Sequence, residues 1–191
     1  LAEAATKRYK RPLRVRVVAD HDDDTVAFTD YHGIYINACN HITWSLPTRL
    51  LRSMSLEGFN AHECGHNLFT DNRIWNSYFS KLEKGKFYPK MPDGLDSMQK
   101  LHAGDILEAV LDEADTVPYQ VIMSVAHALQ NILEDGYVDA RYSYEFPGSP
   151  AKGIALNNLR FADTVPEISE MINRKYYDHS IVLNLLIQYI R

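Results

Sequence analysis

The stretch GFNAHECGHNLFTD, from Gly58 to Asp71, carries the strongest chemical signal in this sequence. It places His62, Glu63 and His66 in the pattern HExxH. Residues four apart lie on one face of an α-helix, so both imidazoles can bind one metal ion. Zinc suits them, because its catalytic sites take three protein ligands and leave one position for water. Glu63 lies beside the histidines and can accept a proton from that water. The stretch therefore predicts a zinc site on a helix.

The residues around this motif favour a helix that is packed inside the molecule. Phe59, Ala61 and Leu68 are apolar, and no proline interrupts them. Gly65 is a poor helix residue, but a closely packed neighbouring helix would require the space that it leaves. The alternative is an ordinary helix whose two histidines bind no metal.

Length and composition indicate one globular domain over residues 1–191. The net charge of −5 argues against a protein that binds nucleic acid. Cys39 and Cys64 do not make a disulfide framework, and we interpret Cys64 as a small core residue. No signal peptide or membrane span is visible, so we expect a cytoplasmic protein with no membrane partner. Because the chain begins at Leu1 without methionine and ends in an apolar segment, we expect it to be a piece of a longer chain.

Hydrophobic periodicity predicts a small sheet followed by helices. The expected strands are Arg14 to Val18, Thr25 to Thr29 and Gly33 to Ala38. The last two strands read as a hairpin. Ser45 or Thr48 caps the helix that carries HExxH, and that helix ends at Thr70 to Asn72. The sequence thus predicts a mixed α+β fold with its sheet in residues 14–38.

Most of the remaining chain is expected to be helical, apart from an irregular stretch at 73–96 and a loop at 146–153. Further helices are expected at about 97–115, at 116–144, after a capping box at Thr164 to Glu167, and from Asp178 or Ser180 to Ile190. The helix at 116–144 contains the segment NILEDGYVDAR, from Asn131 to Arg141. Its carboxylates are the candidates for the third ligand that an HExxH zinc site needs.

These motifs resemble those of the gluzincin branch of zinc metallopeptidases. HECGHNLFTD followed by NILEDGYVDAR, with GIYIN before both, is similar to predicted metallopeptidase domains that occur beside von Willebrand A-type domains, including relatives of the cobaltochelatase T subunit. The resemblance implies a zincin-like fold, zinc ligands His62, His66 and Glu134, and Glu63 as general base. It also implies a second acidic residue that orients one ligand histidine. The expected partners are a peptide or protein substrate and an adjacent von Willebrand A-type domain.

The spacing of the acidic residues leaves two assignments open. Gluzincins have the orienting acid four residues after the glutamate ligand, where this chain has Val138. Asp139 is five residues after Glu134 but four after Asp135. Either Glu134 is the third ligand, or Asp135 is the ligand with Asp139 behind it. We prefer Glu134, because its side of the helix lies opposite the apolar stripe and can face a cleft.

Two functions of different classes fit these residues. The first is a zinc metallopeptidase, in which metal-activated water attacks a peptide bond. A peptide would add to the strand that contains Ile34, Tyr35 and Ile36, as to the edge of a sheet. The second is a catalytically silent, zinc-stabilised scaffold that binds a partner. Glu63 favours the enzyme, because a scaffold has no use for a base. Candidates for the group that stabilises the oxyanion are Tyr137, His102, His127 and Arg141.

Overall fold

The computed structural model describes residues 13–86, 93–112 and 114–190. The chain forms two compact units where the sequence predicts a single domain. The first unit comprises Leu1–Thr70 with Asn131–Arg191, and the second comprises Asp71–Gln130. The candidate zinc ligands and the candidate general base all belong to the first unit.

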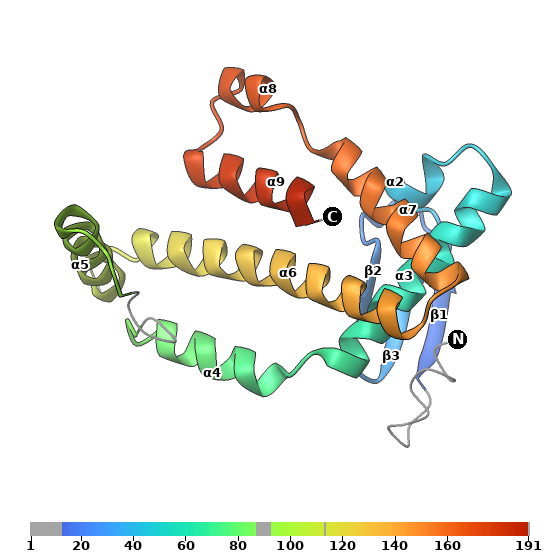
Figure 1. The fold of residues 1–191 in the computed structure, drawn as a ribbon, viewed down its shortest axis with the longest axis horizontal. Coiled ribbons are helices and arrows are strands. Elements are labelled where there is room, and N and C mark those ends of the chain that lie inside the picture. Colours follow the sequence, from blue (N-terminus) through green and yellow to red (C-terminus); the bar gives the residue numbers. More distant parts are fainter. Residues whose placement is uncertain (1–12, 87–92, 113, 191) are drawn as a thin grey trace. The chain divides into compact units, whose positions relative to one another are not determined.

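The first unit contains a small mixed sheet (Figure 1). Strands β1 (Arg14–Val18), β2 (Ala27–Thr29) and β3 (Gly33–Asn37) lie in the order β1-β3-β2. β3 pairs parallel with β1 and antiparallel with β2, which confirms the predicted hairpin. In its turn, Asp30 Oδ1 accepts the N–H groups of His32 and Gly33, each at 2.8 Å. These bonds fix the reversal of the chain between β2 and β3.

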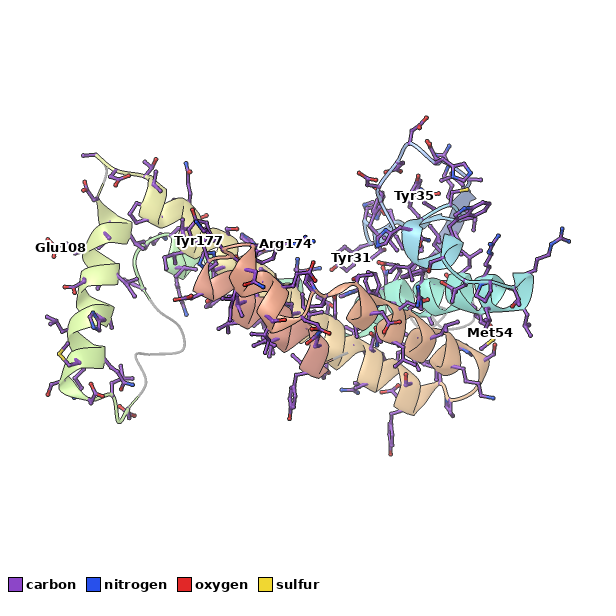
Figure 2. The ribbon with its side chains drawn as sticks, turned by 90° about the horizontal axis from the view of Figure 1, so that it is seen from above. Tyr31, Tyr35, Met54, Glu108, Arg174 and Tyr177 are labelled. Atoms are coloured by element: carbon purple, nitrogen blue, oxygen red, sulfur yellow. The ribbon has the colours of Figure 1, made fainter. Side chains whose placement is uncertain are left out.

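β3 is the central strand, so the prediction that it forms an edge of the sheet is wrong. Its main chain is paired on both sides and has no open edge for a peptide. Ile34 and Ile36 are buried in the core. Tyr35 turns to the opposite face of the sheet, where it stacks on Phe28 and donates to Asp23 at 2.8 Å (Figure 2). Ile34, Tyr35 and Ile36 therefore build the sheet and do not offer the edge pairing predicted for a substrate.

The HExxH motif lies on α3 (Arg49–Phe69), as predicted. The side chain of Thr48 accepts the N–H of Leu51 and begins the helix. The N–H of Thr70 donates to the carbonyl of His66 and ends it. One side of α3 packs on the sheet, and Cys64 on that side is fully buried, as expected of a core residue. The buried core of the first unit comprises Ile34, Ile36, Ile42, Phe59, Ala61, Cys64, Tyr142 and Ile154.

Two glycines of α3 set its distance from neighbouring helices (Figure 1). Gly58 lies against Gly153 of α7 (Ser149–Thr164), where a Cβ added to Gly58 would come 2.2 Å from the Gly153 carbonyl carbon. Gly65 faces Val138 of α6 (Val117–Glu145), where an added Cβ would come 2.4 Å from a Val138 methyl group. The prediction that Gly65 makes space for a neighbouring helix is therefore confirmed.

The helices after α6 differ in part from expectation. α7 begins at Ser149, inside the stretch 146–153 predicted as a loop, because Pro150 is compatible with the first turn of a helix. Thr164 is the last residue of α7, and its hydroxyl donates to the Phe161 carbonyl at 2.7 Å. The predicted capping box at this threonine is therefore wrong. The other helices of the first unit are α2 (His41–Trp44), α8 (Ile168–Asn173) and α9 (Asp178–Ile190).

The second unit contains α4 (Asn72–Leu82), α5 (Ser97–Leu111) and the part of α6 up to Gln130. α4 occupies residues that were predicted to be irregular, so that prediction is wrong for them. Residues 87–92 of the same stretch lie outside the described residues. α5 begins with a capping box between Asp96 and Gln99. Phe79 stacks on His127 with ring centroids 3.8 Å apart, which joins α4 to α6 within this unit.

The fold is α+β, with a three-stranded mixed sheet and a mostly helical body, as the sequence predicts. No helix in the described ranges combines the length and the hydropathy that a membrane crossing requires.

Candidate metal centre

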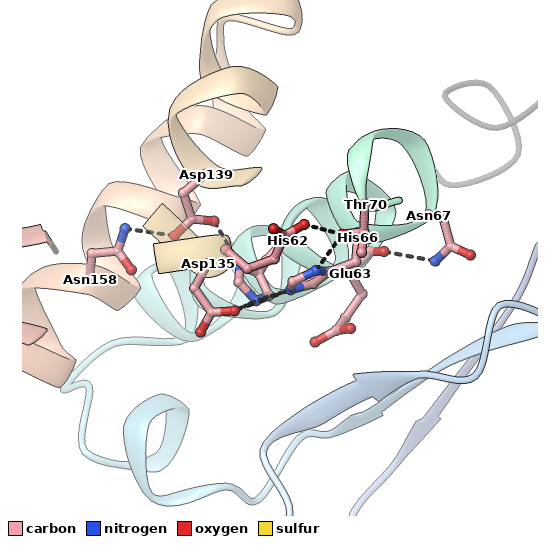
Figure 3. Close-up of polar contacts among 9 residues, drawn as sticks. His62, Glu63, His66, Asn67, Thr70, Asp135, Asp139 and Asn158 are labelled. Carbon is pink, nitrogen blue, oxygen red and sulfur yellow. Dashed lines mark hydrogen bonds and ion pairs between the residues drawn. The ribbon is translucent and has the colours of Figure 1, made fainter. Parts of the chain in front are cut away.

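Three side chains of the first unit bring ligand atoms to one point (Figure 3). His62 and His66 lie one turn apart on α3, and their Nε2 atoms are 3.1 Å from each other. Asp135 comes from α6, with Oδ1 at 3.3 Å from His66 Nε2 and 3.7 Å from His62 Nε2. The two helices thus supply two imidazole nitrogens and one carboxylate oxygen to the same small space.

These distances fit a tetrahedral zinc ion. Zinc bonds of about 2.0–2.1 Å, arranged tetrahedrally, separate neighbouring ligand atoms by about 3.3–3.4 Å. The three separations here are 3.1, 3.3 and 3.7 Å. A set of two histidines and one carboxylate also matches the chemistry of catalytic zinc sites, which keep a fourth position for water. The residues therefore fit the ion that the sequence predicts.

A buried carboxylate orients His62. Asp139 Oδ1 lies 2.7 Å from His62 Nδ1, and Asn158 of α7 donates to Asp139 Oδ2 at 2.9 Å. The carboxylate accepts the Nδ1 proton, so Nε2 is the nitrogen that a metal can bind once its own proton has left. Nothing in the local sequence marks Asn158 as part of the site, because its contact with Asp139 depends on where α7 lies.

A threonine orients His66. His66 Nδ1 lies 3.1 Å from Thr70 Oγ1, and the Thr70 hydroxyl donates to Glu134 Oε1 at 2.5 Å. A hydroxyl has one proton, so Thr70 gives it to Glu134 and accepts the proton of His66 Nδ1. Thr70 was interpreted only as the end of the helix. Its position four residues after His66 was the signal that it shares the same helix face.

The geometry favours Asp135 over Glu134 as the third ligand. Glu134 reaches Thr70 and does not belong to the group of converging ligand atoms. The reason is the rotation of α6 about its axis, which packs Val138 against Gly65 and buries Glu134 and Asp139. This is the alternative arrangement of the sequence interpretation, in which Asp139 stands behind the ligand Asp135.

Glu63 lies beside the ligands but is held differently. Its side chain is 6% exposed and extends on the side of α3 that faces the strands (Figure 3). In the part of the chain that the structure describes, no hydrogen bond fixes its carboxylate. Burial raises the pKa of this carboxyl, although the nearby His62 and His66 act to lower it. A desolvated carboxylate without a fixed partner is free to receive a proton.

The protonation of His62 depends on two opposing effects. Burial acts to lower its pKa, but the hydrogen bond to Asp139 and the charges of Asp139 and Asp135 outweigh burial and raise the pKa to about 9. Without a metal, His62 is therefore a cation at neutral pH. A metal has to displace the Nε2 proton.

A cavity of about 160 Å³ adjoins the ligands on the side of Glu63 and His62. Its wall includes Ala27 of β2 and residues of α3 and α7. All of its lining residues belong to the first unit. The candidate metal centre thus opens onto a space that can receive part of a ligand.

The four candidates for the oxyanion-stabilising group are divided between the two units. Arg141 donates to Glu145 and Tyr137, each at 3.0 Å, and Tyr137 is exposed. His102 and His127 belong to the second unit. Within the first unit, neither Arg141 nor Tyr137 belongs to the group of converging ligand atoms.

Comparison with protein-family models, with curated proteins and with solved structures finds no match for this chain. The resemblance to gluzincins therefore remains a prediction from the motifs.

Proposed function

We propose that this chain is a zinc metallopeptidase domain that hydrolyses peptide bonds. His62, His66 and Asp135 hold the zinc, and Glu63 is the general base. The observation that carries the proposal is the convergence of three ligand atoms whose separations of 3.1, 3.3 and 3.7 Å match a zinc site. Bound zinc supplies a Lewis acid that polarises a peptide carbonyl and lowers the pKa of water.

Other residues of the chain orient the two histidines and transfer the proton. Asp139 and Thr70 contact the Nδ1 atoms of the two imidazoles, so that each ring would present Nε2 to a bound ion. Glu63 takes the proton of the attacking water and returns it to the leaving amine. Its raised pKa makes both transfers easier near neutral pH. The site thus contains a base as well as ligands.

Among the described residues, β2 is the edge strand next to the site, and we assign peptide binding to it in place of β3. Asn67 of α3 donates to Thr29 of β2 at 2.8 Å, which ties the strand to the active helix. The N–H of Asn37 donates to Val26 O, so residues 26 and 37 form a hydrogen-bonded pair. The pattern alternates along an antiparallel ladder, and Ala27 therefore turns its N–H and C=O toward the open edge. A peptide can pair there by main-chain bonds.

The spacing of the carboxylates supports the family resemblance in a modified form. Asp135 and Asp139 are four residues apart, as gluzincins space their ligand and its orienting acid, but the ligand is aspartate. We propose accordingly that the domain is a gluzincin-like peptidase with an aspartate ligand, and that a von Willebrand A-type domain is its neighbour or partner.

A zinc-stabilised scaffold is the second candidate. The geometry of the ligands by itself fits a scaffold as well as it fits a peptidase. Glu63 favours the enzyme, because burying a carboxylate without a hydrogen-bond partner costs stability and gives a scaffold no benefit.

The test compares zinc-loaded wild-type protein with the Glu63→Gln variant on a broad library of fluorogenic peptides. Both proteins should bind one zinc per chain, because Glu63 is not a ligand. Peptide cleavage should fall about 10²–10⁴-fold in the variant, which lacks the general base. A zinc-loaded wild type that cuts no peptide supports the scaffold. A variant that cuts as fast as an active wild type would contradict the role of Glu63 as general base.

A further inference from the structure

The carboxylate that orients His62 is itself bonded to a side chain of a third helix. Asp139 is 5% exposed, and its two oxygens have different partners. Oδ1 lies 2.7 Å from His62 Nδ1, whereas Oδ2 accepts a hydrogen bond from Asn158 Nδ2 at 2.9 Å (Figure 3). An ionised carboxylate only accepts hydrogen bonds, so the NH₂ end of the Asn158 amide is the end that faces it. α7 is thus connected to the metal centre through this bond.

Two contacts with the main chain of α3 determine where α7 lies. Gly153 approaches Gly58 so closely that a Cβ added to Gly153 would come 2.7 Å from the Gly58 nitrogen. Asn157, the residue before Asn158, is 3% exposed, and its Nδ2 donates to the Ser55 carbonyl at 2.9 Å. Asn157 therefore anchors α7 to α3, while its neighbour Asn158 reaches across to α6.

Bonds at both oxygens hold the carboxylate of Asp139 in one plane. The last torsion of an aspartate side chain is broad, so a bond at Oδ1 alone allows the plane to turn. The bond at Oδ2 restricts that turn and fixes the direction from which Oδ1 meets the imidazole of His62. Without Asn158, the buried Oδ2 would lack this donor, and a different orientation of the carboxylate would become favourable.

We propose that Asn158 is a positioning residue of the metal centre. It holds Asp139 in the orientation that fixes the His62 ring and turns Nε2 toward the ligand atoms of His66 and Asp135. This inference rests on the proposed zinc site for its function, but the orientation of Asp139 can be tested without metal. Residues that support a metal ligand typically contribute about 10–100-fold to metal affinity, and we expect Asn158 to do so through Asp139.

The two neighbouring asparagines of α7 provide a matched pair of variants. Asn158→Leu keeps a similar volume and removes the donor to Asp139. Asn157→Leu makes the same change one residue away and removes the bond to Ser55 instead. Asn157 is buried and Asn158 is half-buried, so a general loss of α7 packing would affect Asn157→Leu at least as strongly.

NMR of the metal-free protein with ¹⁵N-labelled histidine measures the contact between His62 and Asp139. The His62 Nδ1 proton should resonate downfield and exchange slowly with water in the wild type and in Asn157→Leu. In Asn158→Leu this signal should move upfield and exchange faster. An unchanged signal in Asn158→Leu would overturn the proposal, and so would an equal change in both variants, because the cause would then be the packing of α7.

Zinc affinity, measured by competition with a chromophoric chelator, is the second readout. It is measured without a peptide, because Asn158 also lines the cavity and its replacement could change peptide binding directly. Asn158→Leu should bind zinc at least about tenfold more weakly than Asn157→Leu. Equal affinities of the two variants would overturn the proposal whatever the NMR result.

Failure of this inference and failure of the proposed function give different results. If the wild type binds no zinc, the proposed function fails, and the NMR comparison still decides whether Asn158 orients Asp139. If the wild type binds zinc and cuts peptides but Asn158→Leu matches Asn157→Leu in both readouts, the inference fails and the function stands. Should Asn158→Leu lack a cooperative thermal transition, Asn158→Ala takes its place in both measurements, because alanine is favourable within a helix.

Discussion

Glu134 and Asp135 are neighbours on α6, yet they reach different parts of the candidate metal centre. A step of one residue turns the side chain by about 100° around a helix. Asp135 therefore points to the Nε2 atoms of both histidines, while Glu134 points to Thr70 at the end of α3. At the scale of the residue, this rotation separates Asp135, the proposed metal ligand, from Glu134, which contacts His66 only through Thr70.

Asp135→Asn and Glu134→Gln form a matched pair of nearly isosteric changes. Glu134→Gln should weaken zinc binding about 10–100-fold, which is typical of residues that support a ligand. Asp135→Asn removes an anionic ligand and should weaken binding more than that. Competition with a chromophoric chelator measures both affinities. Loss of zinc only in Glu134→Gln would show that the first assignment from the sequence was right.

Zinc binding should depend on pH through His62. Its pKa of about 9 in the metal-free protein means that a proton leaves Nε2 when zinc binds below that pH. Because of this one proton, the apparent zinc affinity should rise about tenfold per pH unit below about pH 9 and should level off above it. Calorimetry in buffers of different ionisation enthalpy measures the released proton. Asp139→Asn should move the dependence to lower pH, because it removes the main group that raises the pKa.

The stability of the metal-free protein should fall as the pH rises, whereas its affinity for zinc should rise. The folded pKa of His62, about 9, lies above its ordinary value of 6.5. The contribution of protonated His62 to the free energy of unfolding is therefore fully present below about pH 6.5. It is lost as the pH rises through about 9. Denaturant unfolding in the presence of a chelator should show this decline. A stability that rises over the same interval would contradict the assignment of the proton to His62.

At the scale of the helices, close contacts at glycines determine how near α3 lies to its neighbours. α3 meets α7 where Gly58 and Gly153 approach, and it meets α6 where Gly65 lies under Val138. These contacts bring Asn158 of α7 to the site residues of α6. The geometry of the metal centre therefore depends on helix spacing.

Gly153→Ala should destabilise the protein and disturb zinc binding. The new Cβ would come 2.3 Å from the Met54 carbonyl oxygen, which belongs to the main chain of α3 and cannot move aside easily. The cost should be about 1–3 kcal/mol or more in the free energy of unfolding. Gly104→Ala in α5 is the control, because its Cβ would meet nothing within 4 Å. That change should stabilise α5 by about 0.5–1 kcal/mol, and equal effects of the two changes would exclude a steric role for Gly153.

For the whole molecule, zinc would join residues that are distant in sequence. His62 and His66 belong to the part of the first unit before Thr70, whereas Asp135 belongs to the part after Asn131. The second unit, Asp71–Gln130, lies between them in the sequence, and the three converging residues all belong to the first unit. An ion at this centre would therefore stabilise the first unit selectively.

Removal of zinc should accelerate hydrogen exchange in the second half of α3 and in α6 beyond residue 131. Exchange in α4 and α5 should change little, because neither helix holds a ligand. At a free zinc concentration 100 times Kd, bound zinc adds about 2.7 kcal/mol to the free energy of unfolding. Hydrogen exchange followed by mass spectrometry, with and without chelator, measures the pattern. Uniform acceleration over both units would mean that they unfold together.

Features that depend on near neighbours in the chain could be predicted from the sequence. The helix that carries His62 and His66 begins at Thr48 and ends at Thr70, as its capping residues indicate. The hairpin follows from two short apolar runs and the turn between them. Gly65 is unfavourable in a helix unless another helix approaches it, and Val138 does approach it. Helix periodicity, caps and turns act over a few residues, so a single sequence contains them.

Other features depend on contacts between distant segments. β3 became central because β1 pairs with it, which no alternation within a strand reveals. Asp135 came to the imidazoles because α6 is rotated so that Val138 meets Gly65, and this rotation buries carboxylates instead of a purely apolar stripe. The pattern of polar and apolar residues locates the buried face of a helix only when that face is apolar. At a site whose buried groups are charged, packing against the neighbouring helix sets the rotation.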